Sequence, residues 1–465
     1  MPVSIQHGRS ANHTLRIVCP NGHLGFAPIK TGSFQIGCHC EPDLICADSG
    51  SCDVGPVPLG ADISSSPLQW QVDDLETMLL ASRRLGVPMI VGSAGDTGTN
   101  SRVDLFVGII RDLANKHGLS RFRVGYFYSE VSKDALHRRI VDRDTVMGLD
   151  GRPPLDLATL DATERIVAVA GIHPYIKLLN EGAGVIIGGR SSDCAIFAAP
   201  AIRQGFPEAL AYFYGKVLEC ASFCAEPYGA KESVLGEITM DDVKVTALLL
   251  EQRCTIASVA GHAMYERPNP FYEHFLGGHI DMSRCHYEQY DKRTVRVTGP
   301  QYVPATELRV KLEGSGKIGE RYVGIVGVRD PYTIANIDLV TQWARQQVSE
   351  RFGDSGGYEL HFTVYGRNAI LGEREPMKER QAHELGIVVQ GIAPTKRMAE
   401  EVCMIATRQM FYARLPQVKG TAGGVAFLLD EVMPASPAYR WTLNHTMRLD
   451  DPLELFPTFI TEVGV

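Results

Sequence analysis

Polar and charged residues follow five short apolar segments in the first half of the chain, and their types suit proton transfer and oxyanion binding. The candidates for proton transfer are His23, Asp48 and Glu130. The candidates for substrate binding are Asn21, Ser49, Asp53, Ser93, Asp96, Arg190, Ser191 and Asp193. Imidazole and carboxyl groups act as general acids and bases, and a guanidinium recognises an oxyanion at two points. These residues predict one site of acid–base chemistry, provided that the fold brings them together.

The apolar segments predict the strands that would position these residues. They comprise residues 15–19, 44–47, 87–91, 122–128 and 184–187, and each is short and rich in Val, Ile or Phe. Between them, apolar residues such as Leu75, Met78 and Leu79 recur at helical spacing, and Ser101 with Asp104 predicts the start of a second helix. This alternation is typical of a doubly wound, mostly parallel α/β sheet, whose carboxyl strand ends face a common crevice. We therefore expect the five following loops to converge.

The same loops have a purely structural explanation. Glycine reaches positive φ angles, and Asp or Ser caps helices, so both are common in βα turns whatever the function. His23, Asp48, Asp96, Glu130 and Arg190 together exceed what turn geometry requires. This excess favours a functional site over ordinary turns.

The fifth loop, residues 188–193, leads directly into an apolar helix that begins at Cys194. Exposed amides at that helix start, with Arg190 beside them, suit a carboxylate or a phosphate. The alternative is that Ser192 or Asp193 is only a helix N-cap. Arg190 is the more informative residue, because a planar guanidinium has no capping role.

Composition and charge exclude several function classes. The chain has 465 residues with 54 acidic and 46 basic side chains, a formal charge of −8, which disfavours nucleic-acid binding through bulk positive charge. We find no signal-peptide pattern at the start and no apolar run of about 20 residues, so we expect a cytoplasmic protein without membrane contact. Eleven cysteines, an odd number in a long chain, predict reduced thiols.

Cofactor motifs are weak, and no cofactor is predicted. Gly92, Gly95 and Gly98 match neither the dinucleotide-binding fingerprint nor a Walker loop, and the Gly-x-Ser-x-Gly elbow of hydrolases is absent. Residues 38–40, Cys-His-Cys, are soft ligands that could bind zinc, but no second Cys/His cluster follows at zinc-finger spacing. A divalent cation held by the strand-end carboxylates stays open as an alternative, although hydrogen-bonded carboxylates are commoner.

The rest of the chain predicts two further regions. We divide the chain into an α/β domain at 1–230, a β-containing middle region at 231–319 and a smaller α+β domain at 320–465. The middle region has a hairpin at 285–298, a strand at 307–312 and a glycine-rich connector at 314–319. The last region has strands at 322–328, 359–365 and 387–392 and a helix at 334–352.

His262 and Glu266 in the middle region are spaced one helical turn apart in the sequence. This spacing suits either an acid–base pair or a surface ion pair.

Several of these motifs together resemble the acyclic terpene utilisation (AtuA-like) family. The resemblance rests on residues 16–25 and 47–56, on Leu218-Glu219-Cys220, on residues 287–299 and 329–331, and on the motifs Gly92-Ser93-Ala94-Gly95 and Gly188-Gly189-Arg190-Ser191-Ser192-Asp193. It covers nearly the whole chain. The resemblance implies a role in bacterial growth on branched acyclic terpenoids such as citronellol. The degradation route runs through branched acids and their CoA thioesters, and no settled reaction is assigned to the family. Members often accompany a small companion protein.

We therefore expect a catabolic enzyme of the lyase, hydratase or isomerase type that acts on a branched carboxylic acid or acyl-CoA. Arg190 and the amides after it would hold the carboxylate or thioester oxygen, and Glu130, Asp48 or His23 would move the proton. Asn21, Ser49 and Ser93 would orient the substrate. The alternative is a non-catalytic subunit that binds an acyl ligand or organises a carboxylase or hydratase complex. We expect a homo-oligomer, with a small companion protein as a further partner.

Overall fold

The computed structural model describes residues 13–50, 52–141, 146–229, 231–354, 356–419 and 424–465. The chain divides into two compact units, a larger one of Met1–Ser315 with Trp441–Val465 and a smaller one of Gly316–Arg440. The three-part division at residues 230 and 319 stays a prediction. Within the described residues, no helix is both long enough and apolar enough to cross a membrane.

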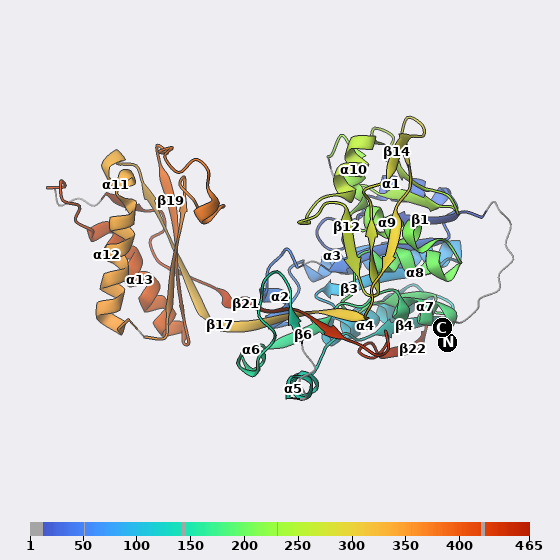
Figure 1. Ribbon diagram of the computed structural model, residues 1–465, viewed down its shortest axis with the longest axis horizontal. Helices are drawn as coiled ribbons and strands as arrows, with labels where there is room; N and C mark the ends of the chain where they lie inside the picture. Colours follow the sequence, from blue (N-terminus) through green and yellow to red (C-terminus); the bar gives the residue numbers. More distant parts are fainter. Residues whose placement is uncertain (1–12, 51, 142–145, 230, 355, 420–423) are drawn as a thin grey trace. The chain divides into compact units, whose positions relative to one another are not determined.

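The larger unit is built on a mixed sheet (Figure 1), to which ten of the strands in the described residues contribute. Its centre is the parallel series β1 (Leu15–Cys19), β2 (Leu44–Gly50), β3 (Met89–Asp96), β7 (Val185–Ile187) and β4 (Phe122–Phe127), in that spatial order. Antiparallel strands extend both edges: β9 (Val234–Ile238), β10 (Val243–Ala247), β15 (Thr294–Thr298) and β14 (His286–Gln289) beyond β1, and β22 (Thr458–Val463) beyond β4.

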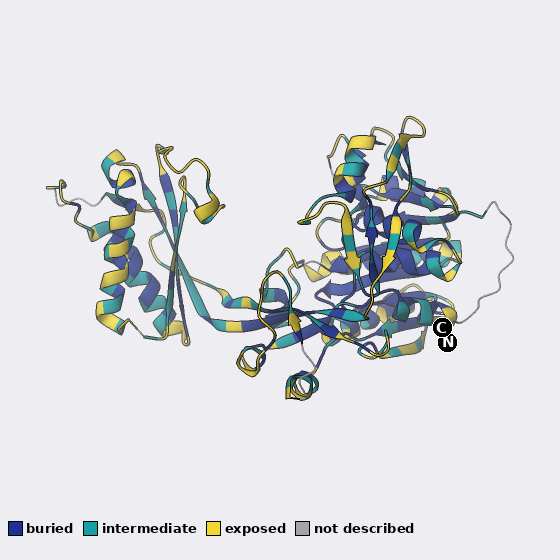
Figure 2. Ribbon diagram, viewed as in Figure 1, coloured by how far each residue is buried: buried dark blue, intermediate teal, exposed yellow. Residues whose placement is uncertain are grey.

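Helices cover both faces of this sheet, because successive strand residues point to opposite sides. Ile17 and Cys46 pack with the helices α7 (His173–Asn180), α8 (Ala195–Arg203) and α9 (Glu208–Leu218). Val18 and Ile45 pack on the other face with α1 (Thr31–His39), α3 (Leu68–Leu85) and α4 (Asn100–Lys116). In Figure 2 the strands between these layers are largely buried. The predicted doubly wound, mostly parallel α/β fold is confirmed.

Shorter elements complete the larger unit. They are α2 (Val57–Ala61), α5 (Lys133–Val141), β5 (Met147–Gly148), α6 (Leu157–Asp161), β6 (Arg165–Ala168), η1 (Ala221–Cys224), β8 (Ala225–Glu226), β11 (Arg253–Cys254), α10 (Ile256–Ala263), β12 (Tyr272–Phe275), β13 (Gly278–Asp281) and β16 (Gln301–Pro304). The strands β14 and β15 form the predicted hairpin.

All five strands predicted for the parallel sheet are present, but two local predictions are wrong. Helix α4 begins after Thr99, and Ser101 lies inside the helix, where its hydroxyl donates to Asp62 at 2.7 Å instead of capping. Helix α10 ends at Ala263, and Glu266 has a positive φ of 65°, so His262 and Glu266 do not share a helical face.

The predicted glycine-rich connector at 314–319 is also wrong, because these residues lie inside one continuous strand, β17 (Arg309–Val328). Residues 312–315 of β17 pair with β6 in the larger unit. Residues 320–328 pair with β19 (Leu385–Ala393) in the smaller unit. The ladder hydrogen bonds with these neighbours outweigh the low strand propensity of glycine, as tertiary context often does.

The smaller unit is an α+β structure. Its sheet contains β18 (Glu359–Tyr365), β19, part of β17 and β20 (Val425–Phe427). Helices α11 (Pro331–Ala335), α12 (Ile337–Phe352) and α13 (Lys396–Tyr412) accompany this sheet, with the short helix η2 (Gly372–Arg374), and Val340, Val402 and Ile387 belong to the common core. The long strand β21 (Met433–Arg448) has residues in both units.

Candidate functional site

The loops after the five parallel strands contact one another at the carboxyl end of the sheet. The amide of Leu24 donates to the carbonyl of Asp48 at 2.9 Å, and Asp48 is paired with Gly92 across β2 and β3. The amide of Arg190 donates to the hydroxyl of Ser129 at 2.7 Å, which joins the loops after β7 and β4. The candidate residues of all five loops therefore lie at one end of one sheet, as their spacing predicts.

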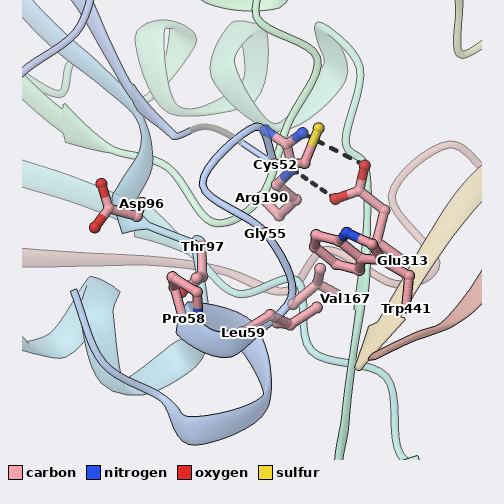
Figure 3. Close-up of a pocket in the computed structure, with 10 residues that line it drawn as sticks. All are labelled: Cys52, Gly55, Pro58, Leu59, Asp96, Thr97, Val167, Arg190, Glu313 and Trp441. Atoms are coloured by element: carbon pink, nitrogen blue, oxygen red, sulfur yellow. Dashed lines mark hydrogen bonds and ion pairs between the residues drawn. The ribbon is translucent and has the colours of Figure 1, made fainter. Parts of the chain in front are cut away.

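Arg190 is buried at the centre of these loops and is held by a carboxylate that the sequence analysis did not single out. Its Nε donates to Glu313 Oε2 at 2.9 Å and its Nη2 donates to Oε1 at 3.4 Å (Figure 3). Its Nη1 faces the hydroxyl of Ser93 and the carboxylate of Asp193, each at 3.3 Å. The guanidinium is thus engaged by side chains of the protein itself.

Glu313 comes from β17, more than a hundred residues after Arg190 in the sequence. Lys311 also donates to it, at 2.9 Å. Burial raises the pKa of Glu313, but the charges of Arg190 and Lys311 outweigh burial and lower the pKa to about 2. The only local signal was the pair Lys311 and Glu313, two residues apart on one face of a strand.

A pocket adjoins the Arg190–Glu313 pair. Its empty volume is about 260 Å³. Pro58 and Leu59 of α2, Val167 of β6 and Trp441 of β21 form an apolar part of its wall, and Figure 3 shows them below the ion pair. Its other lining residues are Cys52, Gly55, Asp96 and Thr97. The pocket therefore offers a short apolar space beside buried charge.

Asp48 is almost completely buried at the end of β2. One carboxyl oxygen, Oδ2, accepts the amide of Gly50 at 3.3 Å, and Oδ1 has no hydrogen-bond partner among the described residues. A Cβ on Gly92 would lie 2.7 Å from Oδ1, so the glycine makes room for the carboxyl group. Burial, reinforced by the negative charge of Asp193, raises the pKa of Asp48 well above its usual range. Asp48 therefore keeps its proton to a higher pH than an exposed aspartate does.

His23 is buried in the loop after β1, and its ring stacks on Phe26 with centroids 3.9 Å apart. Neither ring nitrogen has a hydrogen-bond partner among the described residues. Burial, together with the positive charge of Lys231, lowers the pKa of His23 to about 4, although Asp96 opposes this shift. At neutral pH the ring is uncharged and has one nitrogen available to accept a proton.

Asp96 and Asn21 each have one side-chain polar atom engaged and one oxygen without a partner among the described residues. Asp96 Oδ2 accepts the amide of Ser65 at 2.5 Å and the hydroxyl of Ser64 at 2.8 Å, whereas Oδ1 has no partner in the described chain. Asn21 Nδ2 donates to the carbonyl of Ala27 at 3.0 Å, which leaves Oδ1 unpartnered. The hydroxyl of Ser49, equally buried, is also unpartnered there.

Ser93, Ser191 and Asp193 surround the Arg190 guanidinium. The Ser191 amide donates to Ser93 Oγ at 3.3 Å, and the Ser191 hydroxyl lies 2.7 Å from the hydroxyl of Tyr175. Partial burial raises the pKa of Asp193, against the opposing charge of Arg190, to about 6. Ser93 and Asp193 thus engage the Arg190 guanidinium, and the predicted roles of all three residues in substrate binding stay predictions.

Glu130 and Asp53 lie apart from the buried group. Glu130 accepts the amide of Asn100 at the start of α4, at 3.1 Å, and lies 3.7 Å from Arg165. Burial raises its pKa while Arg165 lowers it, and burial prevails. Asp53 is exposed, and its charge contributes to raising the pKa of Glu266. Their predicted roles in catalysis and binding stay predictions.

A second buried polar group, absent from the sequence-based candidates, lies beside the first loop. Lys216 of α9 donates to Glu219 at 2.6 Å, and both side chains are buried. A Cβ on Gly22 would lie 2.9 Å from the Cα of Cys220, so this segment packs directly on the loop that contains His23. His262 faces Glu219 and Lys216, and burial lowers its pKa to about 4. Helical spacing pairs Lys216 with Glu219, whereas tertiary packing adds His262 and brings the group beside the first loop.

The described residues contain no group of three or more His, Cys, Asp or Glu side chains arranged to hold a metal ion. At the Cys-His-Cys segment, His39 Nδ1 lies 2.7 Å from the carbonyl of Gln35, and the thiol of Cys40 donates to the carbonyl of Ile36. Both side chains thus have local helical partners.

Comparison with known proteins places the chain in one family. No curated protein and no solved structure matches it. The family model described as "Acyclic terpene utilisation family protein AtuA" matches residues 16–443, which include every candidate residue named above. The chain therefore belongs to the acyclic terpene utilisation family, AtuA.

Proposed function

We propose that this protein is a catabolic enzyme of the lyase, hydratase or isomerase type, which acts on a branched carboxylic acid or its CoA thioester. Family membership supports a role in the breakdown of acyclic terpenoids, whose intermediates belong to this substrate class. The observation that carries the proposal is the buried pair His23 and Asp48, two proton-transfer groups whose reactive atoms have no partner among the described residues. Perturbed pKa values in such a position are typical of catalytic groups.

His23 and Asp48 suit opposite roles in proton transfer. His23, with a pKa of about 4, is neutral and accepts a proton, whereas Asp48 keeps its proton to a higher pH than an exposed aspartate does and donates one. His23 would remove a proton from the carbon next to the substrate carbonyl group. Glu130 is less suited to this step, because Asn100 and Arg165 already engage its carboxylate.

Arg190 would act on the substrate mainly through its positive charge and less through direct hydrogen bonds. Glu313 and Asp193 engage its guanidinium, so a two-point bond to a substrate carboxylate would require one of them to move. Its positive charge, which acts on both Asp48 and His23, still stabilises negative charge that develops on a carbonyl oxygen. Ser93 and Ser49 offer hydroxyl groups nearby for orienting the substrate.

The pocket beside Arg190 suits a short branched acyl chain. Its apolar wall of Pro58, Leu59, Val167 and Trp441 would bind the hydrocarbon part. In a thioester substrate, the nucleotide of CoA would lie outside the pocket. Substrate selection would therefore depend on the acyl group.

The test combines binding with isotope exchange. The purified full-length chain is screened by thermal shift against branched acids and their CoA thioesters, and the ligands that bind are incubated with it in deuterated water. We expect deuterium uptake next to the carbonyl group, at least a hundredfold slower with His23→Gln or Asp48→Asn and within tenfold of wild type with Glu130→Gln. Tight binding without deuterium uptake or product would instead identify a non-catalytic acyl-binding subunit.

A further inference from the structure

The unpartnered atoms at the strand ends include both hydrogen-bond acceptors and groups that can donate: Asn21 Oδ1 and Asp96 Oδ1 only accept, whereas the Ser49 hydroxyl and one ring nitrogen of neutral His23 carry a proton. They come from three loops and are, within the described part of the chain, Asn21 Oδ1, Asp48 Oδ1, Asp96 Oδ1, Ser49 Oγ and both ring nitrogens of His23. All five residues are less than 5 % exposed. Buried acceptors without a donor are unfavourable and rare in native proteins. Such a group therefore points to a ligand that both donates and accepts hydrogen bonds, as a hydroxyl group or a water molecule does.

The hydrogen-bond network fixes which oxygens are open. Asn21 must use its amide nitrogen on the carbonyl of Ala27, because a carbonyl only accepts, and this leaves Oδ1 outward. Asp96 must use an oxygen on the amide of Ser65, because that amide only donates. Figure 3 shows the Asp96 carboxylate directed away from the Arg190–Glu313 pair, so Arg190 does not supply the missing donor.

A hydroxyl group fits these acceptors better than a cation does. The positive charges of Lys231 and Arg190 reach His23 and lower its pKa, although the negative charge of Asp96 opposes them. Carboxylates in the described residues do not gather into a group that could hold a metal ion. A hydroxyl group is uncharged, donates one hydrogen bond to an open acceptor and accepts from a neighbouring donor.

We infer that the strand-end site binds the hydroxyl group of a hydroxyacyl substrate, or the water from which it forms, and that the reaction is addition or elimination of water. This inference rests on the proposed function and selects one reaction among the three types. In elimination, His23 takes the proton from the carbon next to the carbonyl, the C–O bond breaks, and Asp48 protonates the departing hydroxyl, which leaves as water beside a new C=C bond. Hydration is the reverse, and no oxidant or reductant is needed.

The first test compares matched ligands on the full-length chain. Titration calorimetry is performed with the CoA thioesters of 3-hydroxy-3-methylbutanoate and of 3-methylbutanoate, which differ by one hydroxyl group. We expect the hydroxy thioester to bind at least tenfold more tightly, because buried acceptors discriminate strongly against a ligand that lacks the donor. Equal affinities would overturn this inference and leave the proposed function standing. Failure of every branched acid and thioester to bind would instead count against the proposed function.

A variant tests whether Asp96 reads the hydroxyl group. In Asp96→Asn, the side-chain oxygen must still accept the hydrogen bond from the Ser65 amide, because that amide only donates. The new NH₂ group therefore takes the place of the open acceptor Oδ1 and is a donor. We expect the tenfold preference for the hydroxy thioester to fall below threefold. Asp242→Asn is the matched control, since Asp242 is also buried but pairs with Arg296. An unchanged preference in Asp96→Asn would overturn the assignment.

The reaction itself is tested with labelled water. The chain is incubated with 3-methylbut-2-enoyl-CoA in H₂¹⁸O, and the hydroxy product is analysed by mass spectrometry. One ¹⁸O atom per product molecule is expected. Absence of label although the thioester binds would overturn the inference, as would binding of the hydroxy thioester that depends on added Mg²⁺ and disappears with a chelator.

Discussion

Arg190 and Glu313 form a two-point ion pair between the loop after β7 and strand β17, with Nε–Oε2 at 2.9 Å and Nη2–Oε1 at 3.4 Å. Both side chains are less than 10 % exposed. Two-point geometry fixes the guanidinium plane, and Ser93 and Asp193 fix its far end. The strand-end site therefore depends on a residue that lies far outside the parallel strands in sequence.

Replacing Glu313 with glutamine should strongly destabilise the protein, because Arg190 would remain buried without its carboxylate. Breaking one side of a buried pair typically costs about 3–5 kcal/mol. Urea unfolding of Glu313→Gln and wild type measures the loss. The control is Glu462→Gln, whose partner Arg123 lies 4.0 Å away in a pair that is more than half exposed, and which should change stability by less than about 1 kcal/mol. Similar losses in both variants would contradict the importance of the buried pair.

Gly98 should tolerate no side chain. A Cβ there would lie 2.1 Å from the backbone nitrogen of Arg190, and its φ is 61°. Gly118 has nearly the same φ, 57°, and no atom within 4 Å of a Cβ. Gly118→Ala should therefore cost only the backbone strain, about 1 kcal/mol. Gly98→Ala should cost about 1–3 kcal/mol more through overpacking, measured as a difference in unfolding free energy. Equal costs would show that the contact with Arg190 relaxes freely.

His262 should make stability depend on pH between about 4 and 6.5. Its folded pKa is lowered to about 4, mainly by burial and further by Lys216 and Arg267, although Glu219 opposes. As the pH falls, His262 binds its proton in the unfolded chain before it does so in the folded protein. The contribution of neutral His262 to the unfolding free energy is therefore complete above pH 6.5 and is lost toward pH 4. The loss corresponds to about 3 kcal/mol. The unfolding free energy of His262→Gln should decline less over this range than that of wild type. Parallel pH profiles would contradict the shift.

Asp48→Asn should not destabilise the protein at pH 7. Folding raises the pKa of Asp48, so its carboxyl group stabilises the fold at pH values below the unfolded pKa, and this stability is lost as the pH rises. The amide of Asp48→Asn does not titrate and therefore avoids the loss. Asp62 provides the contrast, because its hydrogen bonds from Ser101 and Thr99 outweigh burial and lower its pKa. Asp62→Asn should therefore lower stability at pH 7. Urea unfolding at pH 4–8 distinguishes the two, and a less stable Asp48→Asn at neutral pH would contradict this account.

The parallel sheet could be predicted because its signals are local. Short apolar runs, such as residues 15–19, and helical spacing, such as Leu75 and Met78, reflect burial within one element. Because ligands bind at the carboxyl ends of parallel strands, the positions of His23, Asp48 and Arg190 after such strands predict that all three lie at one end of the sheet. Fold class and the location of the candidate site followed from such patterns.

Glu313 and Lys216 could not be predicted in the same way. Each becomes part of the strand-end region only through packing of a segment from elsewhere in the chain, and the local pairs, Lys311 with Glu313 and Lys216 with Glu219, do not indicate that contact. The glycines at 314–319 predicted a connector, but pairing with β6 and β19 made them part of a strand. Local propensity has less weight than such neighbours.

Strand β22, near the end of the chain, has a consequence for dissecting the protein. It pairs with β4 along residues 458–463, and β9 pairs with β1 at the opposite edge of the parallel series. A fragment of the first 230 residues would keep all five parallel strands and lose both of these neighbours. Its bare edge strands would then be free to pair with other molecules and aggregate. The N-terminal half thus requires the later chain for solubility as well as for Glu313.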